Sequence, residues 1–192
     1  MRAKLKTISM YVISLILIVF YIGILIKGIN TDANTEYKLY YVERVLQDWP
    51  GYGGLKYDLG VPIGFGIQEE NVVKRRGKGW GNLEENACWT IGSNASLYFS
   101  EIPSGEPLML SIELESMVPN VIAHIYANDS EVGIITGEID SERMEYKILI
   151  PSDIVSASKE LILEFKIDNP QYINGDKRLL GLMVRQICID LI

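Results

Sequence analysis

The chain has 192 residues, and its 25 acidic and 18 basic side chains give a formal net charge of −7 at pH 7. Four of the basic residues and none of the acidic ones lie in 1–27, so the part from Gly28 onward has 14 basic and 25 acidic residues, a net charge of −11. Such an acidic domain is a poor candidate for binding nucleic acid or anionic lipid, and we expect no nucleic-acid partner.

The first segment, Ile8 to Ile26, runs for nineteen residues without a charge. As a helix it is long enough to cross a hydrocarbon core about 30 Å thick. Arg2, Lys4 and Lys6 precede it, which favours a cytoplasmic N-terminus. A cleaved signal peptide is the alternative, but its apolar region is usually shorter and ends in a small-x-small site, which is missing here. We therefore expect 1–29 to be a single-pass transmembrane signal anchor, with the rest of the chain extracytoplasmic.

The next part, 30–59, begins with the polar stretch "NTDANTE" and is predicted to be a linker that contains a short amphipathic helix at 37–49. Pro50 and the glycines after it break that helix, because proline cannot continue the hydrogen-bond ladder. The apolar residues of the helix recur at three- and four-residue steps: Leu39, Val42, Val45, Leu46 and Trp49.

From about residue 60 the hydrophobic period changes from helical to two, which is typical of strands with one buried and one solvated face. The expected strands are 61–67, 87–91, 95–101, 106–116, 120–127, 131–137, 142–151, 160–168 and 179–191. Asn128, Asp129 and Ser130 are predicted to form the turn of a hairpin. Half-buried strands without intervening helices favour antiparallel sheets packed face to face. We therefore predict an all-β, jelly-roll-like antiparallel β-sandwich over 60–192, preceded by one transmembrane helix.

The two cysteines, Cys88 and Cys188, are a hundred positions apart, which excludes a CxxC redox or zinc motif. In an exported domain they can form a disulfide, and two small buried hydrophobic side chains are the alternative. The lone histidine, His124, lies between apolar strand residues and is more typical of a packed or surface side chain. No zinc set, G-x-S-x-G motif or P-loop is present, so we expect no enzyme, no metal and no cofactor.

Trp80 and Trp89 lie in and just after a loop rich in glycine and charge, "RRGKGWGNLEENACW". Exposed aromatic rings beside polar groups on a β-sandwich bind the apolar faces of sugars. Alternatively, both indoles fill one end of the core, because tryptophan supplies a large apolar area. The sequence leaves both interpretations open.

Several motifs together resemble one known family. Near the start, "GKGWGNLEENACWTIGSNASLYF" has a Gly-Trp, an acidic residue and then Trp-x-x-Gly before an apolar alternation. The matching residues are Gly79, Trp80, Glu84, Trp89, Gly92, Ala95, Leu97 and Phe99, then Tyr126 and Asn128 in a central hairpin, and Asn169, Pro170, Asp176, Arg178, Leu180, Gly181 and Leu182 near the end. Over about 60–192, the pattern resembles the jelly-roll β-sandwich accessory domain associated with bacterial glycosyltransferases and surface-polysaccharide synthesis proteins. The loop "QYIN" before Asp176 is shorter than in that family and lacks its Ser-Pro.

The resemblance implies an accessory role without catalytic residues, and a glycan or glycosyltransferase as partner. Arg178 then either fastens a loop through Asp176, Glu84 or Glu85, or contacts a ligand. The candidate ligand-binding residues are Trp80, Glu84, Trp89, Asp176 and Arg178. Our expectation is a non-catalytic, membrane-anchored β-sandwich that serves cell-envelope polysaccharide synthesis. The alternative is a structural or protein-interaction module with no ligand site.

Overall fold

The structure is a computed structural model that describes all residues except 1, 30–32, 137–143, 156–158 and 174. The last residue of the expected strand 131–137, the first two of the strand 142–151 and the last of the loop "QYIN" lie outside the described residues. The chain forms two compact units, residues 1–34 and Thr35–Ile192, which we describe separately.

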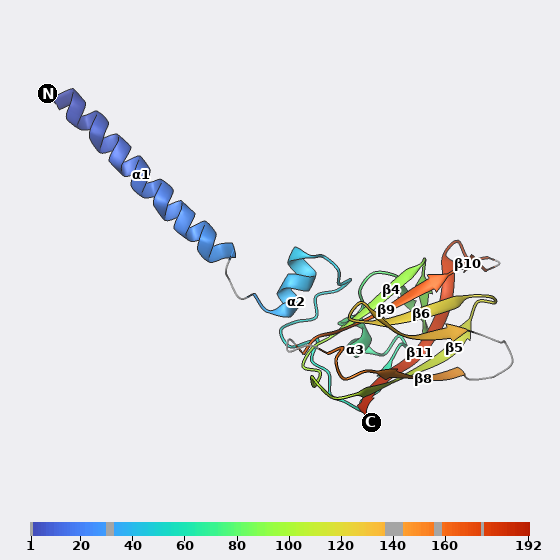
Figure 1. The fold of residues 1–192 in the computed structure, drawn as a ribbon. Helices are drawn as coiled ribbons and strands as arrows, with labels where there is room; N and C mark the ends of the chain where they lie inside the picture. The colour runs from blue at the N-terminus through green and yellow to red at the C-terminus, as the bar shows by residue number, and fades with distance from the viewer. Residues whose placement is uncertain (1, 30–32, 137–143, 156–158, 174) are drawn as a thin grey trace. The chain divides into compact units, whose positions relative to one another are not determined.

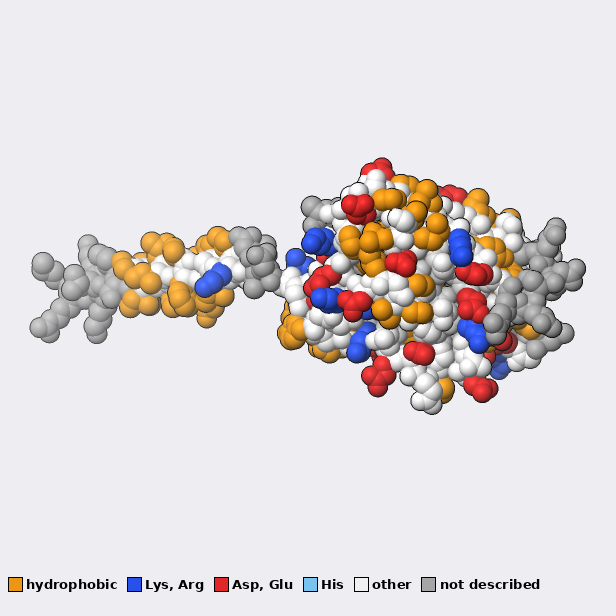
Figure 2. All heavy atoms as spheres, turned by 90° about the horizontal axis from the view of Figure 1, so that it is seen from below, with side chains coloured by type: hydrophobic (Ala, Val, Ile, Leu, Met, Phe, Trp, Pro, Cys, Tyr) orange, Lys and Arg blue, Asp and Glu red, His pale blue; other side chains and the backbone are white. Residues whose placement is uncertain are grey.

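The first unit is one helix, α1 (Arg2–Ile29). Its stretch Met10–Gly28 has 19 residues with a mean hydropathy of 2.4, and none of it is buried by the rest of the protein. Figure 2 shows hydrophobic side chains around the described part of this helix. An apolar helix of this length is compatible with a single-pass membrane anchor or with a signal sequence.

The second unit begins with a helix shorter than the sequence predicted. α2 (Thr35–Tyr37) continues into a π-helical segment, Lys38–Val42. Arg44 then adopts a φ of 56°, a left-handed conformation that ends the helix. Leu46, expected inside the helix, instead forms an isolated antiparallel bridge to Gly77, and its side chain packs against Tyr98 of the small sheet. The expected helix at 37–49 is therefore wrong in extent, because its apolar spacing serves packing against the sheets rather than continued helix.

The rest of this unit is built from strands, with α3 (Glu70–Val73) as a short helical turn. The strands are β1 (Ile63–Gly64), β2 (Trp80–Leu83), β3 (Cys88–Ile91), β4 (Asn94–Phe99), β5 (Leu108–Met117), β6 (Ile122–Ala127), β7 (Ser130–Thr136), β8 (Met144–Ile150), β9 (Leu161–Asp168), β10 (Gln171–Tyr172) and β11 (Leu179–Leu191).

Two antiparallel sheets form the β-sandwich (Figure 1). The large sheet has the order β2-β3-β11-β5-β8, with β1 and β10 also paired to β11, and the small sheet has the order β4-β9-β6-β7. The eight strands β3–β9 and β11 can be lettered B to I in chain order. The large sheet then has the order B-I-D-G and the small sheet the order C-H-E-F, which is the strand order of a jelly roll. The predicted fold class is confirmed.

The hydrophobic core lies between the two sheets. Buried residues alternate with more exposed ones along β5 and β9, as the period of two predicts. Leu97, Leu110, Ile125 and Phe165 are among the largest fully buried side chains. Burying one such side chain stabilises the fold by about 1.5–3 kcal/mol.

The hairpin between β6 and β7 turns at Asn128 and Asp129, whose φ values of 45° and 68° fit a tight hairpin turn. The side-chain amide of Asn128 donates to the carbonyls of Ile154 and Glu160, and its oxygen accepts from the amide of Ile162. The hairpin is confirmed, with the third predicted turn residue already part of β7. Asn128 also joins this turn to β9 and the loop before it.

Candidate functional site

Trp80, on β2, is a core residue. Its side chain is 5% exposed, and its ring centroid lies 4.9 Å from that of Phe65 and 5.5 Å from that of Phe165. The indole nitrogen donates a hydrogen bond to the carbonyl of Ser96 at 2.7 Å. The indole therefore has no free face for a sugar, which corrects the stacking interpretation of Trp80 in favour of the core-filling one.

Trp89, on β3, is half-buried and packs against the edge of the core. Its neighbours Cys88 and Thr90 are buried, so the alternation along the strand places Trp89 on the opposite, outer side of the large sheet. The two indoles therefore do not form a common platform.

Asp176, Arg178 and Glu84 lie together, as the sequence suggested. The guanidinium of Arg178 donates to both carboxylate oxygens of Asp176 at 2.6–3.0 Å, and the Arg178 amide donates to Oδ1 at 2.8 Å. Glu84 is farther away, with 3.9 Å between its Oε1 and an Arg178 nitrogen. Hydrogen bonds from Arg178 lower the pKa of Asp176 to about 2. The bidentate pair holds the loop conformation directly before β11, and the contact with Glu84 links Arg178 to the end of β2, an arrangement that favours fastening over ligand contact.

The two cysteines are free thiols, which contradicts the disulfide between Cys88 and Cys188, one of the two alternatives that the sequence left open. On β11, the residue paired with Cys88 is Val184, four positions before Cys188. At about 3.3 Å per strand residue the cysteines lie roughly 13 Å apart, whereas a disulfide needs Cα atoms about 4.4–6.8 Å apart. Cys88 is buried, and desolvation raises the pKa of its thiol. The alternative of two small buried side chains therefore holds for Cys88, whereas Cys188 is half-buried.

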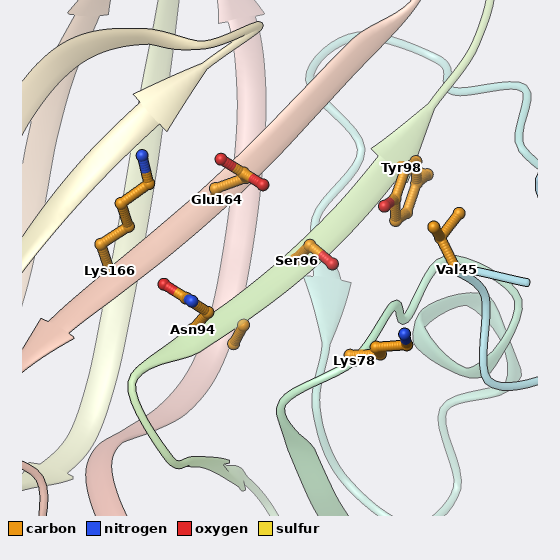
Figure 3. Close-up of a pocket in the computed structure, with 8 residues that line it drawn as sticks. Val45, Lys78, Asn94, Ser96, Tyr98, Glu164 and Lys166 are labelled. Atoms are coloured by element: carbon orange, nitrogen blue, oxygen red, sulfur yellow. The ribbon is translucent and has the colours of Figure 1, made fainter. Parts of the chain in front are cut away.

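A pocket that the sequence did not predict lies on the outer face of the small sheet (Figure 3). Its volume is about 230 Å³, and it is lined by Val45, Lys78, Asn94, Ala95, Ser96, Tyr98, Glu164 and Lys166. Figure 3 shows Asn94, Ser96 and Tyr98 along one strand and Glu164 and Lys166 on the next, with Val45 and Lys78 on the opposite side of the first strand.

Strand pairing positions the polar groups of this pocket. In the β4–β9 pair, Asn94 lies opposite Lys166 and Ser96 lies opposite Glu164. Their neighbours in the two strands are buried in the core, so these four side chains must point outward. The carbonyl of Ser96 accepts from the Trp80 indole, which fixes the floor of the pocket from the core side.

The lining suits a ligand that is rich in hydroxyl groups. Lysine ammonium groups donate hydrogen bonds, the Glu164 carboxylate accepts them, and the amide and hydroxyl of Asn94 and Ser96 do both. Val45 and Tyr98 supply an apolar wall. Pockets for drug-sized ligands usually measure about 300–1,000 Å³, so this one suits a single small ring.

A polar cluster adjoins the pocket on β6, β7 and β9. The His124 ring nitrogens lie 3.1 Å from Glu131 Oε1 and 3.5 Å from Asp168 Oδ2. Tyr126 donates its hydroxyl to Glu131 at 3.1 Å, and Lys166 Nζ lies 3.7 Å from the centre of the Tyr126 ring. The hydrogen bond to Glu131 is the main cause that raises the pKa of His124. His124 is thus an ion-paired surface residue, and Lys166 belongs to both the pocket and this cluster.

A second unpredicted feature is a partly exposed group of rings, which we name the aromatic cluster: Tyr37, Tyr40, Tyr41, Trp49 and Tyr52. Consecutive ring contacts in it have centroid distances of 4.8–5.6 Å. The signal was present in the sequence as "YKLYY" followed by a tryptophan and "GYG", inside the segment interpreted as a linker. Amphipathic-helix spacing explained the aliphatic residues there and left the tyrosines without a role.

No protein-family model matches this sequence, and no curated protein matches it either. Among solved structures, the CBM36-1 domain of a multidomain xylanase from the hindgut metagenome of Trinervitermes trinervoides is similar at 12% identity and a TM-score of 0.43, over 67% of this chain and 94% of that domain. The CBM35 from Paenibacillus barcinonensis is similar at 13% identity and a TM-score of 0.34, over 70% and 92% of the two chains.

The GH115 4-O-methyl-alpha-glucuronidase BtGH115A is also similar, at 16% identity and a TM-score of 0.40. The match covers 60% of this chain, which spans about 15% of the length of that enzyme. At TM-scores this low, none of these likenesses carries an inference about function, and the site has to be judged on its own geometry.

Proposed function

We propose that the unit Thr35–Ile192 is a non-catalytic module that binds a glycan in the pocket on the outer face of the small sheet. The observation that carries this proposal is the convergence of hydrogen-bond donors and acceptors from two adjacent strands on one ring-sized pocket. Sugar hydroxyls both donate and accept, and Ser96, Glu164 and Lys166 together offer both functions.

The pocket also has the energetics of a binding site for one sugar residue. Each neutral hydrogen bond contributes about 0.5–1.5 kcal/mol net, so a few of them give weak, reversible binding. Glycoside hydrolysis usually requires two carboxyl groups that flank the scissile bond. Of the residues that line this pocket, Glu164 alone carries a carboxylate. The lining therefore supports binding rather than cleavage.

We further propose that α1 anchors this module in a membrane, with the N-terminus in the cytoplasm and the β-sandwich outside. The apolar stretch and the three basic residues before it support this orientation. The resemblance of the sequence to accessory domains of surface-polysaccharide synthesis supports a role in cell-envelope assembly, with a glycan or a glycosyltransferase as the partner.

The test is a glycan array followed by titration of the full chain in lipid nanodiscs. Glu164→Gln removes the acceptor charge in the pocket and should weaken binding of the selected glycan about tenfold. Glu145→Gln, on β8 of the other sheet, is the matched control and should leave the affinity unchanged. If no glycan binds, or if both variants bind like the unaltered chain, the glycan site is refuted and a protein-interaction module becomes the better account.

A further inference from the structure

The aromatic cluster presents exposed rings around half-buried Tyr40 and Trp49. Tyr41 and Tyr52 are 52% and 78% exposed, and Trp49 lies between them with ring centroids 5.2 Å and 5.5 Å away. Gly51 and Gly53, on either side of Tyr52, have φ values of 77° and 71°, a backbone conformation that glycine adopts without strain. The sequence "PGYGG" thus places an aromatic side chain in solvent against another ring, and contiguous exposed apolar surface commonly marks a binding site.

The aromatic cluster and the pocket are connected through one small hydrophobic group. Val45 lines the pocket and follows Tyr41 by four residues. Val45 and Tyr40 both pack against the small hydrophobic group of Leu46, Leu55 and Tyr98, and Tyr98 also lines the pocket. The cluster, through Tyr40, and the pocket, through Val45 and Tyr98, therefore adjoin the same small hydrophobic group.

The charges near the rings distinguish between two possible ligands of the aromatic cluster, a membrane surface and a glycan. Exposed Glu43 and Asp48 accompany them, as do exposed Lys38 and Arg44, in a unit that is strongly acidic as a whole. Anionic membrane surfaces repel such a unit, whereas a glycan meets no such penalty. Tyrosine and tryptophan provide flat contact area at a low entropic cost, together with a polar group that hydrogen-bonds hydroxyls.

We infer that the aromatic cluster is a second subsite that stacks the sugar residues following the one held in the pocket. The ligand is accordingly a polysaccharide chain rather than a free sugar. This inference rests on the proposed glycan binding and adds the class of ligand. Because the pocket alone binds weakly, contacts with several successive residues raise the affinity with chain length.

The experiment measures affinity against ligand length for the full chain in nanodiscs. The probes are glucose, xylose, galactose and galacturonic acid, each with its series of oligosaccharides. The unaltered protein should bind the longer members of one series about tenfold or more tightly than the single sugar. Tyr41→Ala and Tyr52→Ala should each remove about three- to tenfold of that gain and leave binding of the single sugar unchanged. Tyr172→Ala, another highly exposed tyrosine on β10, is the control and should change neither.

The outcomes are distinguishable. Absence of binding at every length in every series refutes the glycan function itself. Binding that does not depend on length, or length dependence that survives both ring variants, overturns the second subsite alone. Brominated lipid in the nanodisc provides a further test. If it quenches tryptophan fluorescence in the unaltered chain but not in Trp49→Phe, the aromatic cluster contacts lipid, and the second glycan subsite is overturned.

Discussion

Replacing Trp80 tests whether the core, rather than a ligand, needs this indole. Trp80→Ala removes a ring that packs between Phe65 and Phe165 and is almost fully buried. Truncation of a large buried aromatic residue costs about 3–5 kcal/mol, from lost burial and the cavity left behind. Total stabilities of domains are about 5–15 kcal/mol, so this change removes a large part of the free energy of unfolding.

Trp80→Phe separates the ring from its hydrogen bond. The phenyl ring fills part of the space, but the Ser96 carbonyl loses the indole donor and retains the backbone donor of Gly77 at 2.9 Å. We expect a smaller loss of about 1–3 kcal/mol, composed of one net hydrogen bond and a partial cavity. Because Ser96 lines the pocket, this variant should also weaken glycan binding modestly through a displaced strand.

Urea unfolding of the full chain in detergent, followed by near-ultraviolet circular dichroism, measures both losses. The expected order of midpoints is unaltered chain, then Trp80→Phe, then Trp80→Ala. If Trp80→Ala has an unchanged midpoint but no longer binds sugar, the core role of Trp80 is refuted, because the indole would then contact the ligand.

Three further predictions follow from individual contacts. Asp176 has its pKa lowered from 3.8 to about 2 by Arg178, so the pair stabilises the fold above about pH 4 and this contribution disappears as the pH falls towards 2. Melting temperatures of Asp176→Asn should thus lie below those of the unaltered chain at neutral pH and converge with them near pH 2; a constant difference would contradict the pair. Alkylation of the unfolded, unreduced chain should modify both Cys88 and Cys188, which mass spectrometry detects as two added groups. An unmodified mass would show that the two cysteines form a disulfide. Asn128→Ala should cost about 2–4 kcal/mol in urea unfolding, because three hydrogen bonds are lost at a left-handed residue, and a neutral result would contradict this role.

The strands could largely be predicted because burial on one side imposes a period of two. β5, β8 and β9 follow the expected alternation closely. β2 was missed because its sequence "WGNL" contains a glycine and follows a charged, glycine-rich run, and its pairing with β3 has a register shift. The helix at 37–49 failed for a related reason, since spacing alone cannot show that Leu46 packs against a sheet.

The pocket could not be predicted, because it depends on which strands pair and in what register. Ser96 and Glu164 are distant in sequence, and only the β4–β9 ladder places them opposite each other. The sequence did identify the Asp176–Arg178 pair, because such close neighbours meet without any knowledge of the fold. Whether Trp80 lies in the core or on the surface depends on which side of β2 it occupies. The irregular strand β2 has no alternation of buried and exposed residues, so the sequence could not show on which side Trp80 lies.

A crystal structure of the protein with the glycan that binds most tightly would locate the binding site directly. We predict a sugar ring on the outer face of the small sheet, hydrogen-bonded to Glu164 and Ser96, with the next residues of the glycan over Tyr41 and Trp49. A sugar held instead beside Trp89 and Arg178, or on the outer face of the large sheet, would contradict it.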